Sequence, residues 1–349
     1  MSDLSLEEIK PMLQARALSL ASELAPGGRR EGNYYVAPNP ARADDRIGSF
    51  KVFLTGEAAG GFVEYDSGEK EKGSVFDLII YARKADDIKG ARRWALNWLG
   101  LADLPIDQVK SRAKSAARKQ HKADAEEEAR REYRRKAAYE IWCNGERLAP
   151  GDWVVRYLES RGLALAPELL ARIPLRLAPA LKYIDDGAAT YWPTMLAPMQ
   201  SPGDGRLMAV HRTYLAPDGS GKAPVPSPKR MLGSKSGAYI RLWRSVVGSD
   251  HIVVTEGIED GLTLALADPA LNVHVVGDLG NLAKYQPIAG APVKRLTVMA
   301  DDDGDNPAAQ KALSRALDAL ADRFADVRVA KAPGAKDINA YLTKKEKAS

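Results

Sequence analysis

The spacing of apolar residues changes from helical to alternating and back within the first hundred positions. Residues 5–24 carry an apolar side chain every three or four positions, which predicts one helix that ends at Pro26-Gly27. Short β-type runs between glycine-rich turns then predict a small antiparallel sheet. These runs cover residues 34–36, 49–54 and 61–65. Helical spacing returns at 75–82 and 91–99, so residues 1–102 are expected to form an α+β domain.

The next segment is dominated by charge. Residues 103–150 are rich in alanine, and many opposite charges lie four positions apart. This pattern is typical of a long helix that faces water over most of its surface. Two interpretations stay open, a spacer between domains and a direct contact with a nucleic-acid backbone. In both of them the segment is predicted to be a charged helical linker.

The middle of the chain, residues 151–249, combines a helix predicted from Trp153 to Arg161 with short β-like runs. Residues 217–222 suggest a phosphate-binding loop, but Ala216 stands where its first glycine belongs and Ala223 where its Ser or Thr belongs. A hairpin turn is therefore predicted, and no ATPase motor. Cationic side chains make this middle subdomain basic and form a candidate cradle for phosphates. They are Arg212, Lys222, Lys229, Arg230, Lys235 and Arg241.

Strand-like and helical segments alternate through residues 250–345. Short β-branched runs predict buried parallel strands at 252–255, 273–277, 295–300 and 327–330. Helical spacing predicts helices at 259–267, 281–285, 307–323 and 336–342. Four strand and helix pairs predict an α/β domain with a doubly wound parallel sheet that is flanked by helices.

Acidic residues follow directly after two of these strands. Glu256 follows the first, and Asp301, Asp302 and Asp303 follow the third. In open α/β sheets, ligands collect at the carboxyl ends of the strands, so these side chains are expected to share one site. Crowded, half-buried carboxylates repel one another, and a hard divalent cation with oxygen ligands offsets that repulsion. The pattern predicts Mg²⁺ or Mn²⁺ and metal-assisted phosphoryl transfer.

Composition narrows the classes of function. The chain has 349 residues, enough for two or three domains, and its one cysteine, Cys143, excludes an internal disulfide framework. Its four histidines are scattered without ligand spacing, so zinc is not expected. The net charge of +5 suits a polyanionic partner. No apolar run approaches the roughly 20 residues of a membrane span, and the polar start lacks a signal-peptide pattern. A cytoplasmic protein without a membrane partner is predicted.

Four short motifs, in order along the C-terminal region, resemble those of Toprim domains. The Glu-Gly motif at residues 254–260 is followed at 300–303 by an Asp-x-Asp motif. Bacterial-type primases, topoisomerases and certain nucleases share this pair. Residues 280–283 resemble the Gly-Asn-Leu element of the phage and plasmid primase-like group, and residues 334–339 resemble its Gly-x-Lys-Asp-x-Asn segment.

The resemblance assigns roles to individual residues. It implies that Glu256 is the catalytic acid and that Asp301 and Asp303 are catalytic metal ligands, with Asp260 as a further acid. Because the glycine that usually follows the Asp-x-Asp pair is displaced, a register that uses Asp303 and Asp305 stays open. The expected nucleic-acid or nucleotide-binding residues are Arg212, Lys222, Lys229, Arg230, Arg241, Lys336 and Asp337.

The resemblance extends toward the N-terminus. Residues 206–233 look like the region that precedes the Toprim domain in the same group, and residues 48–79 are similar in order to the zinc-binding domain of primases. The cysteines of that domain are absent, since residues 35–40 lie where a cysteine-containing turn is expected. The resemblance therefore implies a cysteine-free, zinc-ribbon-like domain whose sheet forms without the metal.

Together these observations predict a DNA primase-like enzyme. It would transfer nucleotides from nucleoside triphosphates on a single-stranded DNA template, making RNA primers for a mobile element, with a separate replicative helicase as a candidate partner. Two alternatives stay open: a Toprim nuclease, in which water attacks the phosphorus, and a non-catalytic nucleic-acid-binding replication protein. A topoisomerase is disfavoured because it needs a nucleophilic tyrosine on a further large domain.

Overall fold

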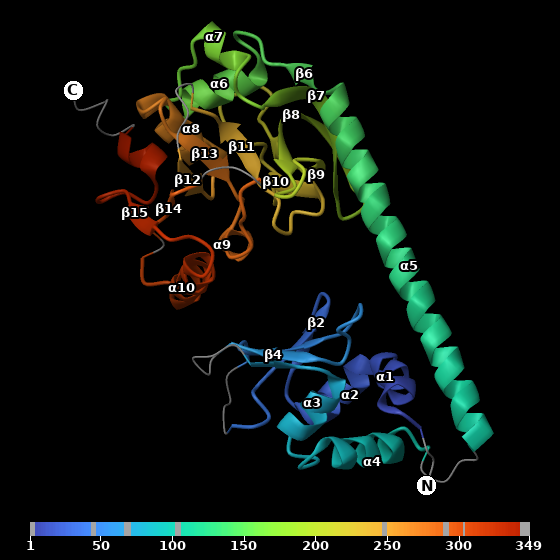
Figure 1. Cartoon of the computed structure of the whole chain (residues 1–349). Coiled ribbons are helices and arrows are strands. Elements are labelled where there is room, and N and C mark those ends of the chain that lie inside the picture. The colour runs from blue at the N-terminus through green and yellow to red at the C-terminus, as the bar shows by residue number, and fades with distance from the viewer. Residues whose placement is uncertain are drawn as a thin grey trace. The chain divides into compact units, whose positions relative to one another are not determined.

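A computed structural model describes residues 4–42, 47–65, 71–101, 106–245, 250–288, 293–302 and 304–342. The chain divides into two compact units, Met1–Arg130 and Arg131–Ser349 (Figure 1). Among these residues, no helix is both long and apolar enough to cross a membrane.

The first unit begins with two helices, α1 (Leu6–Gln14) and α2 (Ala17–Leu24). The prediction of one continuous helix is therefore wrong, because the chain leaves helical geometry at Arg16. The apolar period continues through the break, so the pattern alone does not reveal it. The break lets Ile9 and Leu13 of α1 reach the same core as Leu20 of α2.

An antiparallel sheet follows, as predicted. Its strands lie in chain order, and α3 (Val75–Tyr81) and α4 (Ile88–Trp98) complete the unit. The strands are β1 (Arg29–Glu31), β2 (Tyr34–Ala37), β3 (Phe50–Phe53), β4 (Phe62–Glu64) and β5 (Glu71–Gly73). In the turn where the resemblance places cysteines, the Asn39 side-chain amide donates to the buried Glu64 carboxylate at 2.7 Å and to the Tyr81 hydroxyl at 2.9 Å. A hydrogen-bonded cluster therefore ties this turn to β4 and α3.

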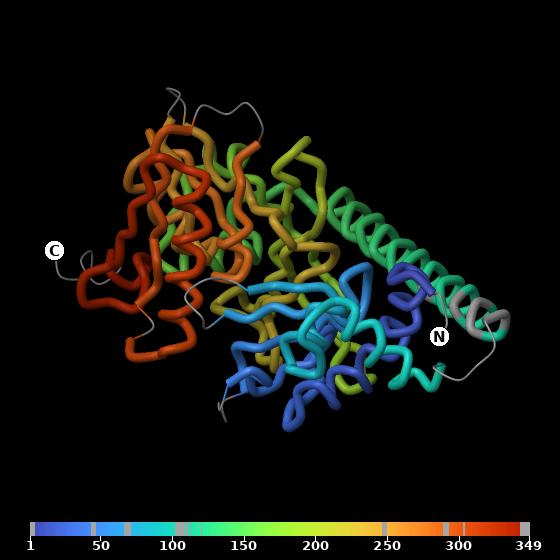
Figure 2. The backbone as a smooth tube through the Cα atoms, turned by 60° about the horizontal axis from the view of Figure 1, so that its bottom comes forward, coloured from blue at the N-terminus to red at the C-terminus, as the bar shows by residue number. Residues whose placement is uncertain are grey.

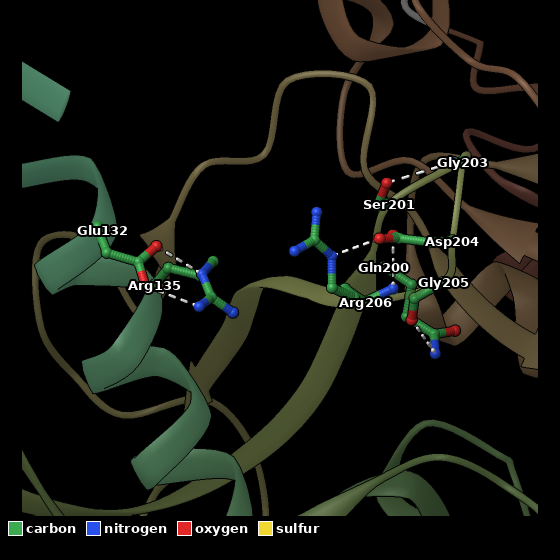
Figure 3. A network of polar contacts seen from close by, with 8 residues as sticks. All are labelled: Glu132, Arg135, Gln200, Ser201, Gly203, Asp204, Gly205 and Arg206. Carbon is green, nitrogen blue, oxygen red and sulfur yellow. Dashed lines mark hydrogen bonds and ion pairs between the residues drawn. The ribbon is translucent and has the colours of Figure 1, made fainter.

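The predicted charged helix is confirmed as α5 (Ile106–Asn144). Its last part belongs to the second unit, where Ala138 packs against Leu196 and Val210. Figure 3 shows Glu132 and Arg135 of α5, which form an ion pair at 2.8 Å. A partly exposed ion pair of this kind contributes little to stability. The apolar contact and a hydrogen bond from the Arg176 side chain to the Trp142 carbonyl, at 2.8 Å, hold this end of α5.

The second unit contains two sheets. The first is antiparallel, in the order β10-β9-β8-β7-β6. Its strands are β6 (Glu146–Arg147), β7 (Arg176–Asp185), β8 (Ala188–Gln200), β9 (Leu207–Tyr214) and β10 (Lys229–Gly233). The second has the order β11-β13-β12-β14-β15. Its strands are β11 (Ile240–Trp243), β12 (His251–Thr255), β13 (Asn272–Val275), β14 (Arg295–Ala300) and β15 (Val327–Lys331).

The second sheet confirms the predicted parallel arrangement and adds one strand. Strands β12 to β15 pair in parallel, whereas β11 pairs antiparallel with β13 at the edge. Strand β11 comes from the range predicted as the middle subdomain. Figures 1 and 2 trace the chain from the yellow strand β10 through β11 into the orange strand β12.

Helices cover both faces of this second sheet. On one face, α8 (Ile258–Ala267) shares an apolar core with α6 (Trp153–Ser160) and with Met195 and Ala209 of the antiparallel sheet. On the other face, α9 (Leu279–Leu282) and α10 (Pro307–Ala321) contribute to a separate core. The short helix α7 (Pro167–Leu170) lines the first core as well. One apolar core thus joins the two sheets of the unit.

This shared core generates a prediction about fragments. Residues 131–349 should give a cooperative thermal unfolding transition, because they contain both sides of the core. Residues 250–349 alone lack β11 and expose the apolar side of α8 and β13, so they should unfold without cooperativity or aggregate. Circular dichroism melting of both fragments checks this. A cooperative transition of the shorter fragment at the same temperature would contradict it.

Candidate catalytic site

Strand pairing brings two of the predicted acids together. Strands β12 and β14 are parallel neighbours, and Val254 pairs with Val298. Glu256 lies two residues beyond Val254, so it comes level with Ala300 and beside Asp301. Both acids are half-buried, and both line one small cavity. The predicted meeting of Glu256 and Asp301 at the carboxyl edge of the sheet therefore follows from the strand register.

A lysine and a turn complete this edge. The Lys331 ammonium, at the end of β15, lines the same cavity and lies 3.6 Å from the Asp302 carboxylate. Gly304, at φ +58°, turns the chain into α10, and its carbonyl accepts a hydrogen bond from the Gln310 side chain at 3.0 Å. The loop that follows β14, which begins with Asp301 and Asp302 and is called the acid loop below, is thus anchored to α10 and faces Lys331. Lys331 was not predicted as a site residue. It directly follows a predicted parallel strand, as Glu256 and Asp301 do, so its position could have identified it.

Two predicted acids are placed differently. Asp303 lies outside the described residues. Asp305 is exposed on the turn before α10. The choice between a register with Asp301 and Asp303 and one with Asp303 and Asp305 stays a prediction.

The donor set at this edge suits a hard divalent cation. Glu256 and Asp301 offer carboxylate oxygens from adjacent strand ends, and Mg²⁺ commonly binds to one or two carboxylates while keeping several waters. Within the part of the chain that the structure describes, no group of three or more Asp, Glu, His and Cys side chains gathers at metal-binding range. Glu256 and Asp301 therefore fit a Mg²⁺ site in which two carboxylates bind the ion and water molecules complete its coordination.

Asp260 is buried on α8 and binds the last motif. Its carboxylate accepts a hydrogen bond from the backbone amide of Asn339 at 3.2 Å. Burial raises the pKa of Asp260, and the charges of Asp337 and Glu259 act in the same direction. The Asn339 side chain donates in turn to the Thr263 hydroxyl at 3.1 Å. The Gly-x-Lys-Asp-x-Asn segment is therefore fastened to α8. A role for Asp260 as a metal ligand stays a prediction.

The two other residues of that motif lie at the surface of the same loop. The Asp337 carboxylate accepts from the backbone amide of Ala340 at 2.7 Å and so caps the final helical turn. Lys336 is exposed, and its carbonyl accepts from the amide of Asp302 at 2.7 Å. This backbone contact places the last motif directly beside the acid loop.

The Gly-Asn-Leu element has a structural explanation. Asn281 is buried, and its side-chain oxygen accepts from the Gly237 amide at 2.7 Å. Its side-chain nitrogen donates to the carbonyls of Ala238 at 2.7 Å and Val276 at 2.9 Å. One amide side chain thus joins the loop before β11 to the end of β13.

The predicted cationic residues on the strands of the first sheet divide between its two faces. Lys229 and Arg230 are consecutive on β10, so their side chains point to opposite faces. Arg230 stacks on the Tyr183 ring at 3.8 Å, and its cross-strand neighbour Arg212 donates to the Tyr214 hydroxyl at 3.2 Å. Arg241 is exposed on β11. These arginines do not share the contacts of Lys229.

Lys222 and Lys229 do come together, at an acid to which sequence analysis gave no role. Their ammonium groups lie 3.7 and 3.6 Å from the Glu259 carboxylate. Glu259 stands in the same Glu-Gly motif as Glu256 and Asp260. Its place three positions after Glu256 could have indicated a role for Glu259 in the site. Its lysine partners could not be predicted, because they come from distant segments of the chain.

The geometry of the C-terminal region agrees with its family match. Residues 251–348 match the Toprim domain family, and the largely parallel sheet with flanking helices confirms the predicted fold. The C-terminal part of the chain is a Toprim domain, preceded by α+β regions. Residues 132–242 match a domain of unknown function (DUF7146).

Several solved structures of primases are similar to the chain at low identity. The primase fragment of the bacteriophage T7 primase-helicase is 22% identical, with 59% of this chain and 76% of that chain covered and a TM-score of 0.39. The Aquifex aeolicus primase, with zinc-binding and RNA polymerase domains, is 15% identical at 99% and 84% coverage and a TM-score of 0.41. A Pseudomonas aeruginosa primase domain is 16% identical at 61% and 75% coverage and a TM-score of 0.42. No curated protein matches the chain.

The hydrogen bonds of Asn281 generate a stability prediction. Asn281→Ala removes hydrogen bonds to three backbone groups and leaves them unsatisfied in a buried place, so it should lower the free energy of unfolding by about 2 to 4 kcal/mol. Urea unfolding of residues 131–349 or of the whole chain measures this. The exposed neighbour Lys284 offers a control, and Lys284→Ala should change stability by less than about 0.5 kcal/mol. Equal stability of the two variants would refute the assignment.

Proposed function

We propose that the protein is a DNA primase-like nucleotidyltransferase that makes RNA primers on single-stranded DNA for a mobile element. The observation that carries the proposal is the pair Glu256 and Asp301 at adjacent parallel strand ends of a Toprim domain. Template DNA and nucleoside triphosphates are the substrates. A separate replicative helicase is the candidate partner, and the cytoplasm is the compartment in which such a reaction takes place.

The residues at the carboxyl edge of the Toprim sheet would each have a separate role in the reaction. Mg²⁺ or Mn²⁺ held by Glu256 and Asp301, with Asp303 as a further ligand, would supply positive charge beside the reacting phosphoryl group. Glu256 would also accept the proton of the attacking ribonucleotide 3′-hydroxyl. The new bond forms between that oxygen and the α-phosphorus of the incoming nucleotide, and pyrophosphate leaves. Lys331 would attract phosphate oxygens to the same edge.

Cationic side chains outside the acid pair would hold the substrates. Lys222, Lys229 and Lys336 are exposed or half-exposed near the loops that bear the acids, and Arg241 is exposed on β11. Arg212 and Arg230 pack against tyrosines of the first sheet and would contact a DNA strand only along that sheet. For a single strand, replacing one cation that binds a phosphate should flatten the slope of log K against log salt by roughly 0.7.

One substitution tests the catalytic assignment. Glu256→Gln keeps the size of the side chain and removes its charge, so primer synthesis should fall by about 10² to 10⁴ while the fold survives. The assay combines single-stranded DNA, labelled ribonucleotides and Mg²⁺ or Mn²⁺, and it resolves both extended and shortened products. Asp326→Asn, which removes an exposed acid paired with Arg328, is the matched control and should keep activity.

The same assay separates the alternatives. Extension products identify a primase, whereas shortened DNA identifies a Toprim nuclease. Full activity of Glu256→Gln would overturn its catalytic role. A wild-type protein that binds DNA but gives neither product with either metal would favour the non-catalytic binding protein.

A further inference from the structure

Glu259 forms the centre of a charged cluster that the proposed reaction does not yet use. It lies in the first turn of α8, is 5% exposed, and accepts a hydrogen bond from the Tyr157 hydroxyl at 2.5 Å. The ammonium groups of Lys222 and Lys229 lie 3.7 and 3.6 Å from its carboxylate. The partners come from α6, from the connection between β9 and β10, and from the first residue of β10. Three segments of the chain therefore meet at one buried carboxylate.

This buried carboxylate has close polar partners on several sides. Removing a carboxylate from water is costly unless such partners replace its lost hydration. The partners of Glu259 are the Lys222 and Lys229 ammonium groups and the Tyr157 hydroxyl. Both lysines are therefore held against one carboxylate.

Two lysines share the one Glu259 carboxylate. Further out, Arg161 acts on Lys222, and the charge of Asp337 acts on Asp260. The buried His211 stays neutral, because burial and the charge of Lys229 lower its pKa to about 4. The lysine side chains are 35% and 42% exposed, so their ammonium groups remain reachable from solvent. Two partly exposed ammonium groups held side by side suit an anionic group such as a phosphate.

The cluster adjoins the turn that carries Glu256. A β-carbon built on Gly257 would lie 3.6 Å from a Glu259 carboxylate oxygen and 2.5 Å from one of Asp260. Gly257 directly follows Glu256. The lysines are therefore held beside the same loop as the proposed catalytic acid, although Lys222 lies between β9 and β10 and Lys229 begins β10.

We propose that Glu259 is a positioning residue that holds Lys222 and Lys229 as a fixed pair, and that this pair binds the phosphates of the nucleoside triphosphate. The proposal rests on the proposed function. It also assigns a function to residues 132–242, the region that matches a domain of unknown function. This region would contribute the two lysines to the site formed by the Toprim acids. Without Glu259, two flexible side chains would repel each other and lose their common position.

The test compares three variants with one control. They are Glu259→Gln, the pair Lys222→Met with Lys229→Met, and the triple variant that combines all these changes. Asp326→Asn again removes a carboxylate from an exposed ion pair in the same domain. Binding of a fluorescent ATP analogue in Mg²⁺ is measured by anisotropy for the whole chain, independently of turnover, and KM and kcat are measured wherever primers form. Circular dichroism melting verifies the fold of each variant.

The expected result is a loss of nucleotide affinity that is not additive. Glu259→Gln should weaken ATP binding about tenfold or more and raise KM more than it lowers kcat, and the triple variant should bind no worse than the lysine pair variant. The control should bind like wild type. Glu259→Gln by itself leaves both lysines without their acid, whereas the triple variant removes all three charges together. If Glu259→Gln does not fold, the ATP affinity of the triple variant is compared with that of the lysine pair variant, and this comparison measures whether Glu259 acts through the lysines.

Two outcomes overturn the proposal. One is a Glu259→Gln variant that folds and binds ATP like wild type. The other is an effect of Glu259→Gln that persists at full size in the background without the lysines, which would show a role apart from them. Failure of the proposed function looks different, since the wild type would then bind ATP in a Glu259-dependent way and yet synthesise no primers.

Discussion

The parallel pairing of β12 with β14 is the constraint on which the rest of this structure depends. It brings Glu256 level with Ala300, and so beside Asp301, at one edge of the sheet, from which the chain continues into α8 and α10. Both carboxylates line one small cavity, where their oxygens suit a hard divalent cation. The buried apolar strands thus hold the two acids in place.

The Toprim sheet depends on the rest of its unit. Strand β11 closes one edge of the sheet, and the core under α8 includes Met195 and Ala209 from the antiparallel sheet. Polar contacts reinforce the same junction, through Asn281 on one side and Glu259 on the other. Apolar packing supplies the stability of this junction, while the buried polar groups define how the two sheets are aligned.

Much of this arrangement could be predicted from the sequence, because it depends on the residue pattern within short segments. The short β-branched runs of β12 and β14 are largely apolar, so the strands and the acids after them could be located. The break at Arg16 could not, because the helical period continues across it. The role of Glu259 was also hidden, since Tyr157 is 102 positions away and no spacing rule joins them. Charge density grouped Lys229 with Arg230, whereas strand geometry separates them.

The most direct test of the central claim is an anomalous diffraction measurement on crystals of the protein grown with Mn²⁺. The account predicts a strong anomalous peak between Glu256 and Asp301, with carboxylate oxygens at about 2.1 to 2.3 Å from it, close to the distances typical of Mg²⁺ sites. The same peak should vanish in Glu256→Gln crystals. Ordered Glu256 and Asp301 side chains without a peak between them, at saturating Mn²⁺, would contradict the assignment of this edge as the metal-dependent catalytic site.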